Sequence, residues 1–157
     1  MIAEMPEFEI KDGVLVCYKG SEKTVVVPEG VTEIGFRSFC DCGFLEEVEI
    51  PGSVRAIAAY AFMRCGNLKS VTLHEGLQEI GMWAFGDCND LESITIPDTV
   101  MEIGQYALGF RQASYQERYV QGKYHSFNSG FHIHHNDNAA AIKYIAFHKL
   151  SLRMVRS

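Results

Sequence analysis

Apolar residues recur in this chain with a long period, not with the short period of a single helix or strand. Three consecutive blocks align without gaps and start 23 residues apart, at Leu45, Leu68 and Leu91. They read LEEVEIPGSVRAIAAYAFMRCGN, LKSVTLHEGLQEIGMWAFGDCND and LESITIPDTVMEIGQYALGFRQA. An upstream block from Glu22, EKTVVVPEGVTEIGFRSFCDCGF, keeps the same apolar columns. Shared columns at one fixed period indicate a repeat architecture.

Each block contains one predicted β-strand. Apolar residues occupy block positions 4 and 6, and alternation of this kind is typical of a half-buried strand. Proline follows in three of the four blocks and ends the strand, because proline cannot donate to a continuing ladder. The apolar pairs are Val25/Val27, Val48/Ile50, Val71/Leu73 and Ile94/Ile96.

The rest of each block predicts how the blocks pack. A turn follows the strand, two more apolar positions return inward, and a small residue then precedes a large one. One block cannot bury its own apolar side, but stacked blocks can cover one another. We therefore expect a solenoid whose strands form a parallel sheet with about 4.8 Å between neighbours. Its interior row would be Phe39, Phe62, Phe85 and Leu108.

The blocks resemble the BspA-type leucine-rich repeat family. That family's pattern is close to Leu-x-x-Val-x-Ile-Pro-x-x-Val-x-x-Ile-Gly-x-x-Ala-Phe-x-x-Cys, and the blocks from Leu45 and Leu68 match it nearly throughout. The resemblance implies an α/β fold, a right-handed leucine-rich repeat solenoid with a parallel β-sheet on its concave face. It also implies an association with surface proteins of host-associated microbes and with adhesion.

The flanking segments resemble the caps of such arrays. Phe8–Gly20 resembles the N-terminal β-hairpin, with Lys11-Asp12-Gly13 as its turn. Residues 131–145 resemble the closing unit. We expect one domain over 1–157, with an N-terminal cap at 8–21, four repeats at 22–113 and a C-terminal strand–helix–strand cap at 114–157. The spacing of Tyr115, Tyr119, Tyr124 and Phe127 predicts a hairpin over 109–130 that joins the fourth repeat to this cap. In the cap we expect a helix over about 138–149 and a last strand near Leu150–Val155.

Charge and hydropathy exclude several classes of protein. The net charge is −6, and residues 1–113 hold 18 of the 20 acidic but only 8 of the 14 basic side chains. An acidic chain of this kind does not favour nucleic-acid binding, which needs clustered cations. No apolar run is long enough for a membrane span. The N-terminal MIAEMPEFEI does not resemble a secretory signal, so we expect a cytoplasmic location.

Cysteine and histidine are the residues whose chemistry needs a decision. Cys42, Cys65 and Cys88 share block position 21, and with Cys17 and Cys40 the count is odd. Their 23-residue spacing matches no zinc motif, so packed apolar thiols are favoured over a disulfide scaffold or a metal site. His132 and His134 point to one side of a predicted strand and could begin a metal site. A structural role for them is favoured, and no metal or other cofactor is expected.

Two surfaces are candidates for binding a partner. The outward strand positions would form an extended contact face, as curved repeat sheets do. Their residues are Glu47, Glu49, Ser70, Thr72, His74, Ser93 and Thr95, preceded by Thr24 and Val26. Block position 16 carries an aromatic column, Tyr60, Trp83 and Tyr106, with Arg37 in the first block. Partly exposed, it would suit an interface or a carbohydrate platform, but stacking against neighbouring coils is favoured.

The sequence predicts a non-catalytic protein. No phosphate-binding loop, nucleophile elbow or His-x-x-x-His motif is present. We expect a recognition module for an unidentified protein or glycan. An alternative is a self-assembling structural module, in which the acidic repeats of one copy contact the basic C-terminal part of another. A small metal-dependent enzyme built on His132 and His134 ranks far behind both.

Overall fold

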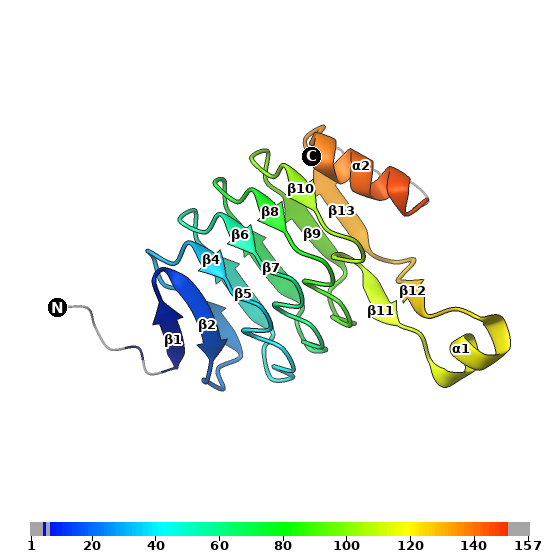
Figure 1. The fold of residues 1–157 in the computed structure, drawn as a ribbon, viewed down its shortest axis with the longest axis horizontal. Coiled ribbons are helices and arrows are strands. Elements are labelled where there is room, and N and C mark those ends of the chain that lie inside the picture. Colours follow the sequence, from blue (N-terminus) through cyan, green and yellow to red (C-terminus); the bar gives the residue numbers. More distant parts are fainter. Residues whose placement is uncertain (1–4, 6, 151–157) are drawn as a thin grey trace.

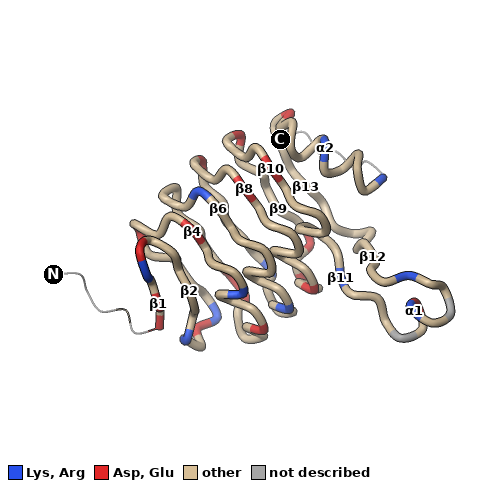
Figure 2. Tube along the Cα trace, in the orientation of Figure 1, with Lys and Arg blue, Asp and Glu red and all other residues tan. Residues whose placement is uncertain are grey.

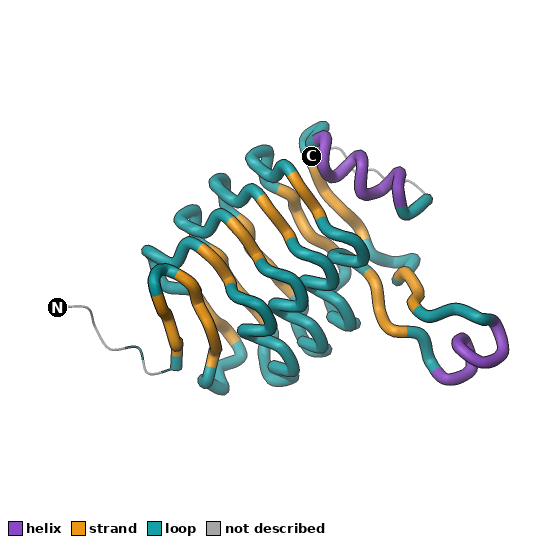
Figure 3. The backbone as a smooth tube through the Cα atoms, viewed as in Figure 1, coloured by secondary structure: helices purple, strands orange, loops and turns teal. Residues whose placement is uncertain are grey.

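The chain folds into four coils stacked along one axis, as Figure 1 shows. The computed structural model describes Met5 and residues 7–150. Each coil runs through a longer strand, a turn, a two-residue strand and a loop that leads to the next coil (Figure 3). The predicted fold class is therefore confirmed: the protein is a β-solenoid with few helices.

The longer strands form the predicted parallel layer. Val48 pairs with Val71 and Ile50 with Leu73, so equivalent block positions lie side by side. One sheet has the order β3-β5-β7, and β9 pairs in parallel with a strand of the C-terminal cap, β13. We call this layer the long-strand sheet. Its strands are β3 (Thr24–Val26), β5 (Glu47–Ile50), β7 (Ser70–Leu73), β9 (Ser93–Ile96) and β13 (His132–His135).

A second parallel layer was not predicted. Two-residue strands on the other side of each coil pair in register, with Ile34 beside Ile57 and Ile57 beside Ile80. Two residues are too short for alternation to reveal a strand, because the pattern needs four or more positions. We call this layer the short-strand sheet. It contains β4 (Glu33–Ile34), β6 (Ala56–Ile57), β8 (Glu79–Ile80) and β10 (Glu102–Ile103).

The core between the two layers contains the predicted interior row. The rings of Phe39, Phe62 and Phe85 stack with centroid separations of 4.8 and 5.1 Å, and all three are at most 1% exposed. Leu108 continues the row and is fully buried. Close approach of the coils leaves no room for a side chain at Gly81, because a Cβ there would overlap the backbone of Ala58 and Ala59.

The loop after each short strand adopts a left-handed backbone at block position 16. Tyr60, Trp83 and Tyr106 have φ of 56–60°, and so does Arg37 in the first coil. Bulky residues rarely adopt this conformation. It turns their N–H groups toward the next coil, where Tyr60 N–H donates to the Met82 carbonyl and Trp83 N–H to the Gln105 carbonyl. The aromatic column is thus held by inter-coil hydrogen bonds.

The predicted N-terminal hairpin is present. β1 (Phe8–Lys11) and β2 (Val14–Tyr18) are antiparallel, and Asp12 and Gly13 between them both have positive φ, as a tight two-residue hairpin turn requires. β2 then pairs in parallel with β4. The hairpin therefore covers the open end of the short-strand sheet.

The hairpin predicted over 109–130 forms, but the helix that connects its two strands was not predicted. β11 (Phe110–Gln112) and β12 (His125–Phe127) are antiparallel, and a helix, α1 (Tyr115–Gln121), joins them. The spacing of the tyrosines suggested strand there. Ser114 and Glu117 contained the missed signal, because they form a capping box at the start of α1. This segment projects away from the stacked coils (Figure 1).

The C-terminal cap contains the predicted strand and helix. α2 (Ala139–Phe147) begins after Asn138, which is its N-cap, because the Asn138 side chain accepts from Ala141 N–H. Asn138 also donates to the carbonyls of Pro97, Asp98 and Val100, which fixes the helix to the fourth coil. Of the predicted last strand, only Leu150 lies within the described residues. No helix in the described part of the chain is long and apolar enough to cross a membrane.

Candidate functional site

The outward residues of the long-strand sheet form one exposed face. Along β5 the inward Val48 and Ile50 are at most 2% exposed, whereas Glu47 and Glu49 point to solvent. Every predicted contact residue of this face is exposed, namely Glu47, Glu49, Ser70, Thr72, His74, Ser93 and Thr95. The parallel register places Glu47 beside Ser70 and Glu49 beside Thr72. The predicted surface is therefore continuous across the coils.

The cap extends this face by one strand. In β13, His132 pairs with Ser93 and His134 with Thr95, so both histidines point to the same side as the outward residues of β9. The two rings stack with centroids 6.4 Å apart. His135 follows in the opposite orientation and is 2% exposed. The sequence grouped His132 with His134, but it did not assign them to the contact face.

His74 and Glu49 are linked across neighbouring strands. The His74 Nε2 atom lies 2.9 Å from Glu49 Oε1, and both side chains are about half exposed. An exposed pair of this kind contributes little to stability. Both groups therefore stay available to a partner.

Two open hollows border the face at the carboxyl ends of its strands. The larger, of about 710 Å³, is lined by Val26, Pro28, Glu49 and Pro51 among others. The smaller, of about 330 Å³, is lined by Thr95, Pro97 and Asn136 among others. His74 and Glu75 border both hollows. The Glu75 carboxylate is itself held by the backbone N–H groups of Asp98 and Thr99 at 3.0 and 3.2 Å.

The aromatic column does not belong to this face. Tyr60 packs edge-on against Phe36, with the Arg37 guanidinium 5.7 Å from the Tyr60 ring centroid. Trp83 instead packs on Tyr106, with ring centroids 5.1 Å apart. The structure thus divides the column between two packing groups, and each ring is half-buried.

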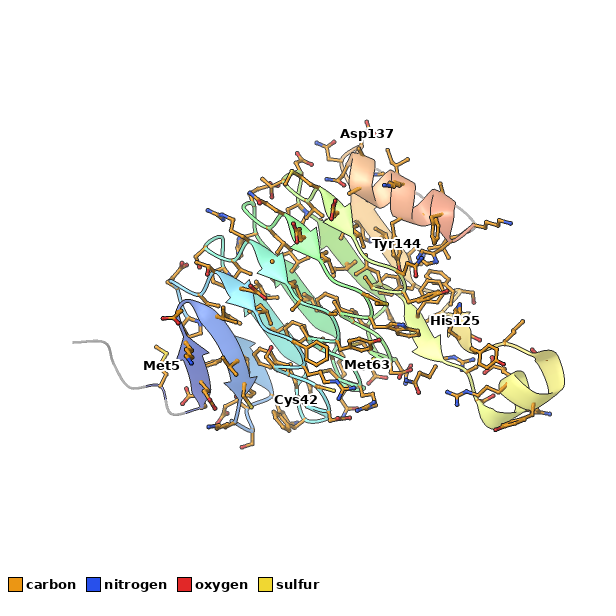
Figure 4. All side chains as sticks on the ribbon, viewed as in Figure 1. Met5, Cys42, Met63, His125, Asp137 and Tyr144 are labelled. Carbon is orange, nitrogen blue, oxygen red and sulfur yellow. The ribbon has the colours of Figure 1, made fainter. Side chains whose placement is uncertain are left out.

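The second aromatic group joins the coils to the cap. The Tyr106 ring lies 4.0 Å from the His125 ring and 5.2 Å from the His148 ring, measured between centroids. Figure 4 shows His125 and Tyr144 approaching this corner from the hairpin and from α2. Ring-to-ring packing of this kind is the interpretation that the sequence favoured for the aromatic column.

The cysteine column packs along the core. The Cys65 thiol donates to the Phe39 carbonyl at 3.1 Å, and the Cys88 thiol donates to the Phe62 carbonyl at 3.2 Å. Burial raises the pKa of Cys42 to about 11 and that of Cys88 to about 12. All five cysteines are free thiols. Within the described residues, no group of three or more His, Cys, Asp or Glu side chains could hold a metal ion.

A third surface was not predicted. A groove of about 630 Å³ lies between the short-strand sheet and α2. Its floor includes Ala58, Gly81 and Gly104, and its wall includes Lys143 and Phe147 of α2. In the sequence, the residues that could have drawn attention to this surface are the glutamates at block position 12, namely Glu33, Glu79 and Glu102. The groove could not be inferred from the repeats alone, because it forms only where α2 packs beside them.

Parallel coils with a hairpin at one end and a helix at the other define a capped repeat protein, and comparison with known proteins gives its family. A family model described as "BspA type Leucine rich repeat region" matches in six copies over residues 14–131. The chain belongs to this family. The resemblance inferred from the repeats is thereby confirmed.

Solved structures of bacterial leucine-rich repeat proteins are similar to this chain. A leucine-rich cell surface protein of Faecalibacterium prausnitzii is 29% identical, with a TM-score of 0.56 over 61% of this chain and 27% of that one. The T. pallidum leucine-rich repeat protein is 27% identical, with a TM-score of 0.54 over 67% of this chain and 65% of that one.

A leucine-rich repeat protein of Bacteroides capillosus is 30% identical, with a TM-score of 0.56 over 64% of this chain and 88% of that one. The chain thus spans about a quarter of the F. prausnitzii protein and just under two thirds of the T. pallidum protein. No curated protein sequence matches the chain.

Proposed function

We propose that this protein is a non-catalytic recognition module that binds a protein partner through the long-strand sheet. One observation carries the proposal: the outward polar side chains of β5, β7 and β9 are exposed on strands whose other side packs against the core, and the partly exposed His132 and His134 of β13 continue the row. A rigid scaffold of this kind presents a preorganised face, so binding costs little conformational entropy. Glu47, Glu49 and His74 supply charge and hydrogen-bonding groups.

A protein partner is favoured over a glycan. Carbohydrate platforms rely on exposed aromatic rings, and the outward residues of β5, β7 and β9 include none. The rings of Tyr60, Trp83 and Tyr106 are half-buried in packing contacts elsewhere. The two hollows beside His74 suit protruding side chains of a partner.

A photo-crosslinking experiment tests this proposal. A photoreactive residue at Thr72, in the middle of the face, should crosslink a discrete partner in a lysate of the source organism. The same residue at the exposed Asp90, in a loop outside the sheet, is the matched control. Glu49→Lys should abolish the Thr72 crosslink by reversing a charge on the face. Equal crosslinking from Thr72 and Asp90, or no effect of Glu49→Lys, would refute the proposal.

Self-assembly is the second candidate, because charge is unevenly distributed. Arg118, Lys123, Lys143 and Lys149 are exposed in the C-terminal part, whereas acidic positions recur along the coils (Figure 2). Attraction between exposed charges weakens with ionic strength. Light scattering should then show oligomers at about 20 mM salt that dissociate at about 500 mM salt, because the Debye length is much shorter at the higher salt concentration. A monomer at both salt concentrations eliminates this candidate.

A further inference from the structure

The groove between the short-strand sheet and α2 combines features that the proposed contact face lacks. It lies on the other layer of the solenoid and encloses about 630 Å³. Small residues line part of its floor, namely Ala56, Ala58 and Ala59 of one coil and Gly81 and Gly104 of the next two. The α2 helix forms one wall. The result is a channel with room for a chain segment.

No ion pair within the described residues neutralises the negative charge in the groove. Glu33, Glu79 and Glu102 line the groove, and none of them forms an ion pair within the described residues. Elsewhere the pattern differs, since Glu46 is paired with Lys23 and Lys69, and Glu117 with Arg111. The acidic positions on β4, β8 and β10 are visible in Figure 2.

Glu79 and Glu102 are also direct neighbours. They are register partners on β8 and β10, so their side chains leave adjacent strands on the same face. Like charges directly opposite one another in a sheet are destabilising. Among the described residues that line the groove, Lys143 is the only Lys or Arg. Two carboxylates held side by side match the charge of a basic ligand.

Large apolar side chains flank these carboxylates. Met101 is 64% exposed and Phe147 is 63% exposed, and both line the groove. Exposed apolar surface rimmed by charge is typical of an interaction site. A methionine adapts to ligands of varied shape. The ligand therefore needs apolar parts as well as positive charge.

The edge of the short-strand sheet also ends in the groove. In the third coil, the Gln78 carbonyl accepts from Met101 N–H and the Ile80 carbonyl accepts from Gly104 N–H. The equivalent carbonyls of the fourth coil are those of Met101 and Ile103, and both residues line the groove. Neither carbonyl accepts a backbone hydrogen bond from beyond the fourth coil within the described residues. An extended peptide could donate to both carbonyls, which is how strands are added to exposed sheet edges.

We propose that this groove binds an extended, basic peptide segment of a partner protein, with its Lys or Arg side chains paired to Glu79 and Glu102 and its apolar side chains against Met101 and Phe147. Charge complementarity selects this occupant, and the open strand edge favours an extended peptide over a small polyamine. The site lies on a different sheet from the contact face, so either can fail without the other.

Fluorescence anisotropy with a labelled Arg-Val-Arg-Val-Arg-Val peptide tests the site on the full chain. Glu102→Gln should weaken binding by about tenfold, the equivalent of about 1.4 kcal/mol, and Glu79→Gln should do the same. Glu92→Gln is the matched control, because Glu92 is exposed and lies outside the groove. The same peptide with Glu in place of Arg should not bind. Glu49→Lys, which tests the contact face, should leave this binding unchanged.

Four results would overturn the proposal. Equal weakening by Glu92→Gln would mean non-specific attraction to an acidic protein. Spermine binding as tightly as the peptide would mean a cation site without strand addition. A peptide with every backbone nitrogen methylated that binds equally tightly would mean that backbone N–H groups are not used. Binding by a chain ending at Leu150 but not by the full chain would assign the groove to the protein's own C-terminal segment.

Discussion

The Tyr144 hydroxyl of α2 replaces a missing fifth coil at Leu108. It accepts from Leu108 N–H at 2.9 Å and donates to the Leu108 carbonyl at 2.8 Å. In the earlier coils the equivalent N–H groups bond to the next coil, as Phe62 N–H does to the Ala84 carbonyl. One side chain thereby pairs two buried backbone groups that the end of the array would leave open.

Tyr144→Phe should destabilise the protein by about 1–3 kcal/mol, because it leaves buried backbone groups without partners while keeping the ring. Urea denaturation would measure the loss. Tyr124→Phe is the control, since Tyr124 is 75% exposed and should change stability by less than about 0.5 kcal/mol. Equal effects of the two substitutions would show that the hydroxyl does not cap the array.

Ser38→Ala should stabilise the protein. Ser38 occupies the block position that is alanine in the other coils, is 3% exposed, and its Oγ has no hydrogen-bond partner within the described residues. A buried unpaired hydroxyl costs about 1 kcal/mol or more, so the midpoint of urea unfolding should rise. Ala61→Ser, the reverse change one coil later, should lower it. A lower midpoint for Ser38→Ala would show that the hydroxyl is paired in solution.

The coils could be predicted because their signal is repeated. Val48, Val71 and Ile94 recur at one period, and the long strands, the phenylalanine row and the outward face follow from that period alone. The two-residue strands were missed because Glu79–Ile80 is too short to alternate. Helix α1 was missed because tyrosine spacing outweighed the capping box at Ser114.

The groove depends on information that periodicity does not contain. Glu79 and Glu102 are visible in the sequence as a column, but nothing local places Lys143 and Phe147 beside them. That placement results from the tertiary packing of α2, which Asn138 and Tyr144 fix to the fourth coil. Features at the end of an array therefore have to be determined from the structure.

All five cysteines should be alkylated after denaturation without reductant. The mass of the protein, measured by mass spectrometry, should then rise by the mass of five alkyl groups. In the folded protein at pH 8, Cys65 should not react, because it is fully buried and burial raises its pKa. A pKa of about 11 leaves roughly a thousandth of Cys42 as thiolate at that pH. A protein that gains two or four fewer alkyl groups than this would contain disulfides. The cytoplasmic location stays a prediction, and free thiols are consistent with a reducing compartment.

His148 should make the cap sensitive to mild acid. Its Nε2 atom accepts from Tyr106 N–H at 3.4 Å, and its ring lies 4.8 Å from that of Phe110 between centroids. Burial lowers the pKa of His148 below its ordinary value of 6.5, and the charge of His125 adds to this effect. Protonation would remove the acceptor and place a positive charge close to the His125 ring.

The sign of the pH dependence follows from this lowered pKa. Above pH 6.5 His148 is neutral in both the folded and the unfolded state, so its protonation does not affect stability. As pH falls below 6.5 the unfolded chain takes up the proton first, and stability is lost until pH passes the lowered folded pKa. Glu117 also has a lowered pKa, because of Arg111, but its contribution is lost only below about its ordinary value of 4.5. Between pH 6.5 and 5, a change in stability therefore reports on the protonation of histidine and not on that of Glu117.

Urea unfolding followed by the fluorescence of Trp83, the single tryptophan, should show stability falling between pH 6.5 and 5. His148→Gln should flatten this dependence, because the amide oxygen can accept from Tyr106 N–H and does not titrate. His74→Gln, on the exposed sheet face, should leave the dependence as it is. If the His148→Gln and wild-type curves fall in parallel over this range, another group controls the acid sensitivity and the His148 contact does not.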